Sequence, residues 1–236
     1  MSRRRKLIIT IDGPAGTGKS TAARHLARHL RYLYLDTGAM YRAIGLKALR
    51  RKVSLNDPHA LTRLAEHSRI TLHPAQGGGV RTSLDAKDVS QAIRRPEVSE
   101  AASKVAAVPG VRRALVRLQR RIGRAGGVVA EGRDTGTVVF PQADWKVYLT
   151  ASLAERSRRR YKELRAAGLP VKLSEVRKET AERDRRDQTR KHSPLRPAKG
   201  AIYIDNTRLK SEQVFAKLLA YVRKSKVYAS SDRRTI

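Results

Sequence analysis

A glycine-rich loop near the start of the chain constrains the fold more than any other feature. The stretch Gly13-Pro-Ala-Gly-Thr-Gly-Lys-Ser20 fits G-x-x-x-x-G-K-[ST], and it lies between an apolar run at residues 6–12 and a segment with helical spacing at residues 20–30. Glycines allow consecutive backbone N–H groups to turn inward around a phosphate, and the N-terminus of a following helix adds its dipole. Lys19 would place its charge on the β- and γ-phosphates, and the Ser20 hydroxyl would reach Mg²⁺.

The loop therefore predicts a nucleoside triphosphate site. The ATP-binding residues expected from it are Gly13, Pro14, Ala15, Gly16, Thr17, Gly18, Lys19, Ser20 and Thr21. A glycine turn that serves only as a connector is the structural alternative, but it needs neither the lysine nor the two hydroxyls.

Short apolar runs alternate with helical segments along the rest of the chain. Strands are expected at residues 6–12, 33–35, 128–130, 146–149 and 202–204. Helices are expected at residues 20–30, 39–51, 59–69, 97–121 with a break at Pro109-Gly110, 154–167, 174–191 and 211–223. The alternation predicts an α/β fold of the P-loop type, in which helices flank a parallel β-sheet core. Residues 69–73 and 80–84 flank three glycines, which predicts an inserted antiparallel hairpin.

The composition is strongly basic and lacks cysteine. Lys and Arg number 52 against 21 Asp and Glu, a net charge of +31 in 236 residues. This charge attracts polyanions non-specifically, but the basic residues are spread out and aromatics are few, so a solvated arginine-rich surface is favoured over a specific nucleic-acid role. Some of the charge could also serve phosphate-bearing small molecules. The lack of cysteine excludes disulfides and fits a cytoplasmic protein. We expect neither a membrane span nor a signal peptide.

The class of P-loop protein can be narrowed by motif. The GTPase motifs D-x-x-G and N-K-x-D do not occur. Small-molecule kinases fit better, because they need a second anion site facing the loop and arginine clamps phosphate through two donors.

Six stretches, the glycine loop among them, carry a specific resemblance. They are ITIDGPAGTGKST, YLDTGAMYRA, ASKVAAVPGVRRAL, VVAEGRDTGTVVFPQADWKVYLTAS, ERDRRDQTR followed by SPL, and IYIDNT. In this order, from about Leu7 to Arg223, they resemble the bacterial cytidylate kinases, nucleoside monophosphate kinases that phosphorylate CMP and dCMP with ATP. The resemblance implies one P-loop kinase domain over residues 1–236, which acts as a monomer on ATP and CMP or dCMP without a specific nucleic-acid partner.

The resemblance also divides the chain. It implies a core at residues 6–53, 97–153 and 191–224, a nucleoside monophosphate (NMP)-binding insert at about 54–96 that includes the hairpin, and a helical lid at about 154–190. The tails at residues 1–5 and 227–236 are basic or polar, and we expect them to be disordered. Closure of the insert and lid over both nucleotides would keep water from the transferring phosphoryl group.

The roles of individual residues follow from the same resemblance. The catalytic residues are Lys19, Arg133, Arg156 and Arg190, and the lid adds Arg159 and Arg160 to the ATP site. The CMP site comprises Thr37, Tyr41, Arg42, Ser103, Arg112, Arg133, Asp134, Arg183, Asp187 and Arg190. Within it, Ser103, Arg112 and Asp134 would contact cytosine, Arg183 and Asp187 the ribose, and Arg42, Arg133 and Arg190 the phosphate. Ser20 would bind Mg²⁺, with Asp36 acting through a water.

Several of these residues have plain structural alternatives. The lid arginines could form a solvated face, and Tyr41 could pack in the core. Asp36 could cap the helix that follows it, Asp134 could pair with an arginine, and Arg183 and Asp187 could form only an i,i+4 pair. Ser103 could face the helix surface.

Two departures from the family pattern stand out. Ala86-Lys87 occupies a turn where the family often has Gly-Glu, which bears on the geometry of that turn, and Glu131 stands where some members have aspartate. The rival functions are a P-loop kinase for another small acceptor, such as shikimate, and a basic RNA-associated protein that senses nucleotide.

Overall fold

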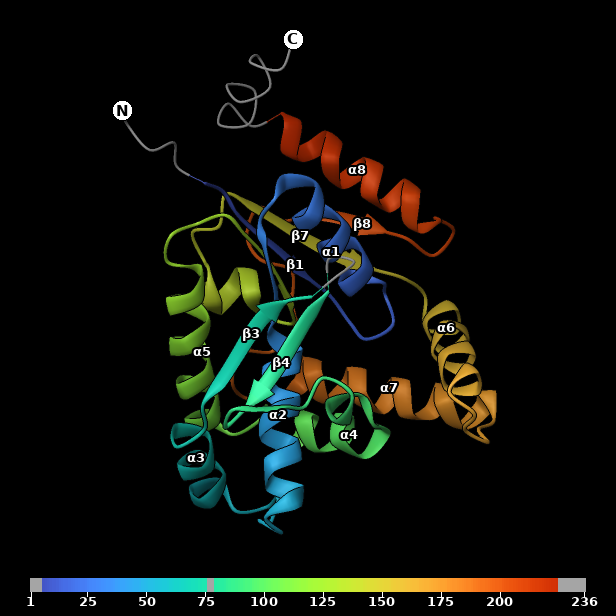
Figure 1. Cartoon of the computed structure of the whole chain (residues 1–236). Helices are drawn as coiled ribbons and strands as arrows, with labels where there is room; N and C mark the ends of the chain where they lie inside the picture. Colours follow the sequence, from blue (N-terminus) through green and yellow to red (C-terminus); the bar gives the residue numbers. More distant parts are fainter. Residues whose placement is uncertain (1–5, 76–78, 225–236) are drawn as a thin grey trace.

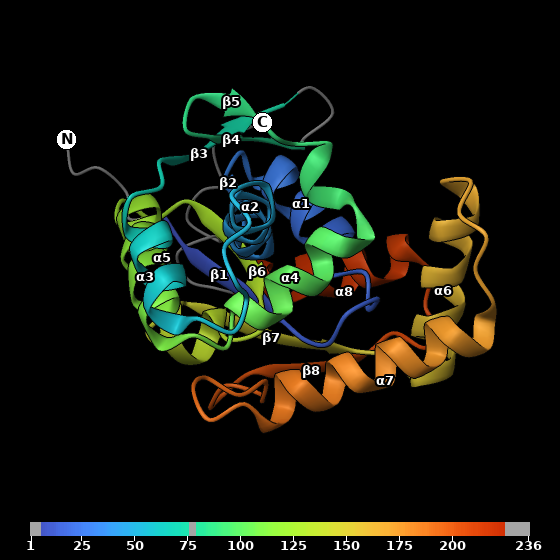
Figure 2. The same cartoon turned by 90° about the horizontal axis from the view of Figure 1, so that it is seen from below.

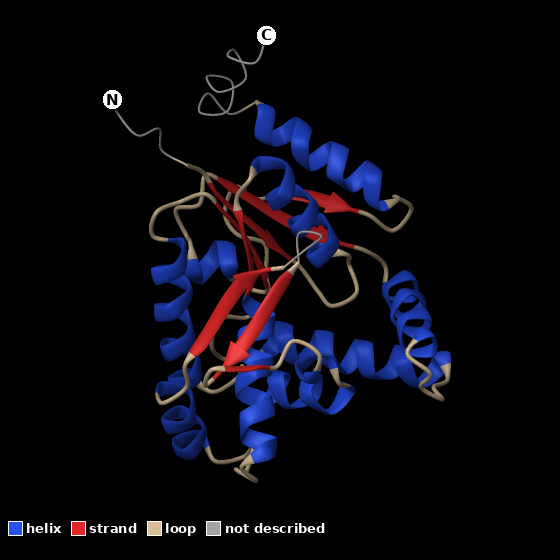
Figure 3. Ribbon diagram, in the orientation of Figure 1, coloured by secondary structure: helices blue, strands red, loops and turns tan. Residues whose placement is uncertain are grey.

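A five-stranded parallel sheet forms the centre of the computed structural model, which describes residues 6–75 and 79–224. The sheet order is β2-β6-β1-β7-β8. Figure 1 labels β1, β7 and β8 of this sheet, and Figure 3 draws the strands in red. The strands are β1 (Ile8–Asp12), β2 (Leu33–Asp36), β6 (Val128–Gly132), β7 (Trp145–Thr150) and β8 (Ile202–Asp205). Because all five are parallel, their carboxyl ends lie along one edge, which is where ligands bind in open α/β sheets. The predicted fold class is confirmed.

Two apolar cores lie on opposite faces of this sheet. On one face, Ile9 and Ile11 pack with α1 (Lys19–Leu30) and α8 (Ser211–Arg223). The other core includes α2 (Thr37–Arg50), α4 (Pro96–Val105) and α5 (Pro109–Gly123). Alternate residues of a strand point to opposite faces, so the continuous β-branched run of β1 fits a strand buried on both sides.

The segment at 54–96 carries a second, antiparallel sheet. It contains α3 (Pro58–Glu66), β3 (Ile70–Pro74), β4 (Val80–Leu84), β5 (Lys87–Asp88) and a 3₁₀ turn, η2 (Ala92–Arg94). The predicted hairpin is confirmed as β3 and β4, and β5 adds a third strand. Leu61, Ile70 and Leu84 belong to the same apolar core as Leu35 of the main sheet, so the insert shares its core with the rest of the chain. Lys47 of α2 adds a salt bridge of 2.7 Å to Asp85 in the β4–β5 turn.

Two basic helices form the segment predicted as the lid. Helix α6 (Leu153–Ala166) follows β7 directly, and α7 (Leu173–Thr189) packs against it (Figure 2). Ser152 begins α6 by accepting a hydrogen bond from the Glu155 backbone N–H at 3.2 Å. A movement of these helices remains a prediction.

The observed elements follow the expected ones closely, with small differences at their ends. Strands β2 and β6 run on to Asp36 and Gly132, and the break expected at Pro109 begins after Val105, with Pro109 as the first residue of α5. The predicted disordered tails lie outside the described residues. Within the described ranges, no helix is both long enough and apolar enough to cross a bilayer.

A π-helical turn, η3 (Thr135–Val139), was not predicted. Its amides at Thr135 and Gly136 donate to the carboxylate of Asp12 at 2.8 and 2.7 Å. Burial raises the pKa of Asp12 to about 6, although these hydrogen bonds favour its charged form. The turn thus depends on a contact across 123 residues of sequence, which no local pattern contains.

Candidate active site

The glycine loop has the backbone geometry of an anion cradle. Gly16 and Gly18 have φ of +76° and +80°, in the left-handed region that favours glycine. A Cβ on Gly13 would lie 1.9 Å from the Leu149 carbonyl oxygen of the neighbouring strand. No side chain caps the N-terminus of α1 and no acidic residue lies in its first turn, so its backbone donors and its dipole remain available to a phosphate.

Lys19 lies inside this cradle. Its Nζ donates a hydrogen bond of 2.6 Å to the Pro14 carbonyl oxygen, and the side chain is buried. Burial and, to a smaller extent, the nearby Arg133 lower the pKa of Lys19 to about 7, against the opposing effect of the carboxylates of Glu131 and Asp12. A bound triphosphate would reverse this shift because it brings negative charge to the same place.

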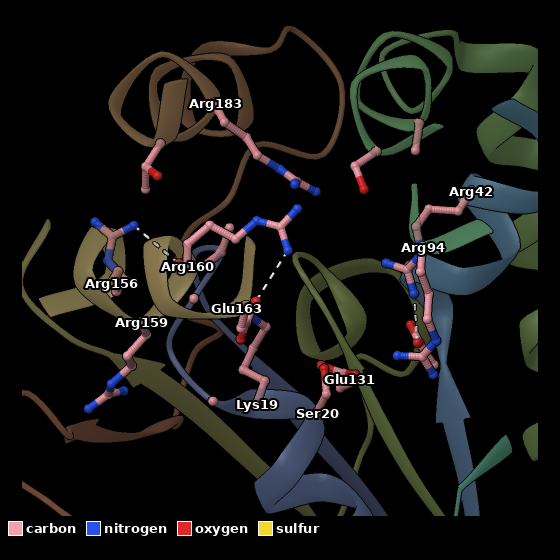
Figure 4. A pocket seen from close by; sticks show the side chains of 18 of the residues that line it. Lys19, Ser20, Arg42, Arg94, Glu131, Arg156, Arg159, Arg160, Glu163 and Arg183 are labelled. Carbon is pink, nitrogen blue, oxygen red and sulfur yellow. Dashed lines mark hydrogen bonds and ion pairs between the residues drawn. The ribbon is translucent and has the colours of Figure 1, made fainter. Parts of the chain in front are cut away.

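Two carboxylates stand beside the loop at the ends of neighbouring strands. Asp36 and Glu131 are register partners in the β2–β6 pair. Burial raises the pKa of Glu131, and the adjacent Asp36 raises it further. The Tyr34 hydroxyl donates to Glu131 at 2.5 Å, and Figure 4 shows Glu131 close to Ser20. Oxygen ligands of this kind suit a hard cation that keeps much of its own water, such as Mg²⁺. The described residues contain no group of three or more His, Cys, Asp or Glu able to hold a metal by themselves.

Sequence reasoning noted Glu131 only as a retained carboxylate and gave it no role. Its place at the carboxyl end of a central parallel strand was the available signal. Asp36 does cap α2, accepting from the Ala39 N–H at 2.8 Å, and it also pairs with Arg42 at 2.8 Å. The cap is confirmed, while its contact with a Mg²⁺ water remains a prediction.

A cavity of about 1680 Å³ runs from the glycine loop to the residues expected at the CMP site and to the helices predicted as the lid; the end that carries the expected CMP residues is called the acceptor end. It is lined by Lys19, Tyr41, Arg42, Ser103, Arg112, Arg133, Asp134, Arg156, Arg159, Arg160, Arg183, Asp187 and Arg190, among others. The structure thus brings together side chains from α1, α2, α4, α5, α6, α7 and the loops that follow β6 and α7 (Figure 4).

The residues expected to recognise cytosine form one side of this cavity. Arg112 is paired with Asp134 in a buried salt bridge, and the Arg112 guanidinium lies 5.5 Å from the centre of the Tyr41 ring. The structural alternative for Asp134, a pair with an arginine, is confirmed, and its contact with cytosine remains a prediction. Tyr41 is buried, which agrees with the alternative that it packs in the core. Burial raises the pKa of its hydroxyl to about 12. Ser103 lines the same cavity, so the alternative that it only faces the helix surface is wrong.

Arg133 and Asp187 meet at the next part of the cavity, 2.7 Å apart. Asp187 therefore forms its salt bridge with Arg133. The alternative that Asp187 forms only an i,i+4 pair with Arg183 is wrong. Burial and Arg133 together lower the pKa of Arg183 to about 10.

Several buried polar atoms in this cavity lack a hydrogen-bond partner. They are the Tyr41 hydroxyl, Ser103 Oγ, Arg183 Nε and one Arg190 Nη, which has an ion pair of 3.6 Å with Asp134 but no hydrogen bond. Buried polar groups are normally satisfied, so this concentration of unsatisfied atoms from separate elements indicates a polar ligand.

The lid arginines differ from one another. Arg156 is buried, pairs with Asp184 at 2.7 Å and donates to the Ala15 carbonyl oxygen of the loop at 3.3 Å, so a solvated face is wrong for this residue. Arg159 donates hydrogen bonds to Glu155 and to the Asn206 side chain. The side-chain amide of Asn206 in turn donates to the Thr17 carbonyl oxygen at 2.6 Å. Arg160 pairs with Glu163 at 3.1 Å. Asp184 and Asn206 were missed, because their importance depends on these distant contacts.

Known proteins are similar in sequence to nearly the whole chain. The family model for cytidylate kinase matches residues 9–224. A cytidylate kinase from Carboxydothermus hydrogenoformans is 51% identical, covering 91% of this chain and 96% of its own length. One from Solibacter usitatus is 49% identical, covering 94% of both chains. A bifunctional pantoate ligase/cytidylate kinase from a Synechococcus species is 52% identical, but this chain spans only 41% of its length. The chain therefore belongs to the cytidylate kinase family.

Proposed function

We propose that this chain transfers the γ-phosphoryl group of ATP to CMP or dCMP, giving ADP and CDP or dCDP. The observation that carries the proposal is the buried Arg112–Asp134 pair in a cavity continuous with the glycine loop. Family membership supports a nucleoside monophosphate kinase, and the cavity is lined both by Lys19 and by the distant Arg112 and Asp134.

The proposed reaction needs alignment and charge neutralisation rather than covalent catalysis. The acceptor phosphate oxygen is already nucleophilic, so no strong general base is required. Lys19 would bind the β- and γ-phosphates and stabilise the negative charge that develops on the leaving ADP. Arg133 and Arg190 would hold the acceptor phosphate in line, while Arg156, Arg159 and Arg160 would approach from the lid.

Mg²⁺ is the proposed cofactor. Its chemistry when bound would be to neutralise the triphosphate and fix its conformation. The residues that would hold it are Ser20 directly and Asp36 and Glu131 through water. This donor set fits because two carboxylates and a hydroxyl lie around the first turn of α1.

Base selection rests on the pattern of donors and acceptors. Cytosine has an exocyclic amine beside acceptors at N3 and O2. A carboxylate such as Asp134 would accept from the amine, while Arg112 and Ser103 would donate to the acceptors. Uracil reverses part of this pattern, so UMP would leave a buried group unpaired.

A panel of nucleoside monophosphates tests the proposal. Steady-state rates of ADP release with CMP, dCMP, UMP and AMP should be highest with CMP and dCMP. Equal rates with all four would defeat the base-recognition assignment. We also propose a cytoplasmic, monomeric enzyme of pyrimidine nucleotide metabolism, whose charge of +31 gives at most salt-sensitive, non-specific binding to polyanions.

A further inference from the structure

Asp12 stands between the glycine loop and the residues of the acceptor end. It is the last residue of β1, and Gly13 of the loop follows it directly. Its side chain is 3% exposed and does not line the cavity, so it is not placed to touch either nucleotide. A buried carboxylate is costly unless hydrogen bonds satisfy it, so the partners of Asp12 indicate what it does.

Three hydrogen bonds tie this carboxylate to the turn that follows β6. Its Oδ1 accepts from the backbone N–H and from Oγ1 of Thr135 at 2.8 and 2.7 Å, and its Oδ2 accepts from the Gly136 N–H at 2.7 Å. Hydrogen bonds to an ionised acceptor are stronger than those between neutral groups. The carboxylate of Asp12 therefore determines where the backbone of this turn lies.

Arg133 and Asp134 lie between two points that Asp12 holds. Before them, Gly132 is the register partner of Asp12 in the β1–β6 pair. After them, Thr135 is bonded to the Asp12 side chain. A segment of two residues with both ends fixed keeps little freedom in its backbone, so the position of this segment depends on Asp12.

The side chains of this segment make contacts that need an accurately placed backbone. Arg133 reaches Asp187 of α7 at 2.7 Å, and Asp134 pairs with Arg112 of α5. A displacement of about 1 Å in groups that align a reaction can cost about 100-fold in rate. A residue that holds the segment in place can thus affect the reaction without touching a nucleotide.

We propose that Asp12 is a positioning residue of the reaction, which acts through Thr135 on Arg133 and Asp134. This inference rests on the proposed function, because it assigns the effect to the acceptor end of the cavity. Loss of the contact between Asp12 and Thr135 should weaken CMP binding and reduce the preference for CMP over UMP. ATP binding should persist, since the amides of residues 13–20 do not depend on the Thr135 hydroxyl.

Two threonines supply a matched pair of variants. Thr135 and Thr10 are both 0% exposed, and Thr10 lies on β1 two residues before Asp12. Thr135→Val removes a hydroxyl that donates to Asp12, whereas Thr10→Val removes one that donates to the Trp145 carbonyl oxygen at 3.4 Å. Valine has the shape of threonine, so each change removes one hydroxyl and little else. Thr135→Ser keeps the hydroxyl and is the rescue variant.

Steady-state ADP release with CMP and with UMP, together with calorimetric titration of CMP and ATP, tests the inference. We expect Thr135→Val to lower kcat/KM for CMP by about 10- to 100-fold, the range for one hydrogen bond to a charged group. The value for UMP should fall less, so the preference for CMP narrows. Thr135→Ser should restore most of the rate, Thr10→Val should match the unaltered chain, and all three variants should keep their ATP affinity.

Replacing the carboxylate itself gives a second test. Asp12→Asn should lower kcat/KM for CMP more than Thr135→Val does, because its side-chain NH₂ would face an N–H donor. Adding Thr135→Val to Asp12→Asn should cost little more, since both changes break the same contact. The threonine variants decide the question by themselves if Asp12→Asn does not fold, which thermal unfolding would show.

Three outcomes would overturn the inference. Thr135→Val could match Thr10→Val in its rate and in its preference for CMP, it could weaken ATP rather than CMP, or its effect could multiply with that of Asp12→Asn in the double variant. If the unaltered chain turned over CMP in preference to UMP, these results would leave the proposed function standing. An unaltered chain with no CMP-dependent ADP release would instead defeat both.

Discussion

The loop end and the acceptor end of the cavity are built to hold negative charge by different means. At the loop end, backbone amides of residues 13–20 and the N-terminus of α1 provide partial charges, and Lys19 is the one ionisable side chain of that stretch. At the acceptor end, full charges come from Arg42, Arg112 and Arg133, which belong to segments far apart in the sequence.

This difference determines what each end needs before a ligand arrives. Backbone amides require no counter-ion, so the loop can form without one. Guanidinium groups crowded into a cavity repel one another and lose solvation, which a partner carboxylate offsets. Asp36, Asp134 and Asp187 provide such partners. The acceptor end is thus an arginine cluster whose charge is offset by aspartates. A bound nucleotide would share these arginines with the aspartates or displace them.

Removing the Lys19 amine at the loop end should have the largest effect on the rate of phosphoryl transfer. Lys19→Ala should lower phosphoryl transfer by about a thousandfold or more, because the β- and γ-phosphates lose their charged contact. Coupled ADP release measures the rate. Titration with CMP is the control, since the acceptor end should keep its affinity. A Lys19→Ala chain with near-normal turnover would show that the amides suffice by themselves.

A change at the acceptor end should alter selectivity more than rate. Asp134→Asn should reduce the ratio of kcat/KM for CMP over UMP by about 10- to 100-fold, because an amide can present a donor where cytosine also has one. Asp134→Ala should in addition destabilise the chain by about 3–5 kcal/mol, since it leaves Arg112 buried and unpaired. Thermal unfolding separates these effects, and an unchanged CMP preference in Asp134→Asn would remove this residue from base recognition.

The ionisation of Lys19 gives a pH test of the loop end. Its pKa of about 7 without ligand lies below the ordinary value of 10.5. Above pH 7 the free amine is mostly neutral, and bound triphosphate raises its pKa, so ATP binding should take up protons. The affinity should then fall by up to about tenfold per pH unit above 7.

Calorimetry in buffers of different ionisation enthalpy counts the protons. Lys19→Arg is the control, because arginine stays charged throughout and should show no uptake beyond that of ATP itself. Equal uptake by the two chains would contradict a lowered pKa of Lys19.

The smallest expected effect lies in the insert and should leave both ends of the cavity untouched. Asp85 and Ala86 form a two-residue hairpin turn with φ of +49° and +67°, and alanine is strained in this region. Ala86→Gly should therefore stabilise the chain by about 1 kcal/mol, a rise in Tm of about 2–4 °C. Turnover of CMP should stay the same, and a lower Tm would show that the turn is not strained.

The departure from the family pattern at Ala86 thus has a physical reading. Where the family often has glycine, the turn still forms here with a positive φ, held in part by the Asp85 carboxylate. This carboxylate accepts from the Arg69 N–H at 2.9 Å and pairs with Lys47 at 2.7 Å. The sequence pointed to the turn, and these contacts explain why it persists without glycine.

Prediction from sequence succeeded where the cause was local. The glycine loop, the helices that follow β1 and β2, and the β3–β4 hairpin depend on residues close together in the chain. The resemblance identified the cavity residues, but it did not indicate their electrostatic partners. Three of these partners lie in distant segments. Asp184 forms a salt bridge with Arg156, Glu131 accepts a hydrogen bond from Tyr34, and Asn206 donates one to the Thr17 carbonyl oxygen.

The sequence by itself determined the α/β alternation, the triphosphate cradle and the family, because glycine positions, apolar periodicity and motifs are properties of the chain read in order. Only the tertiary structure decided which arginines of the cavity are neutralised by a carboxylate. The reason is physical: the charge of a guanidinium is fixed by its chemistry, but the carboxylates that surround it are fixed by how the chain folds.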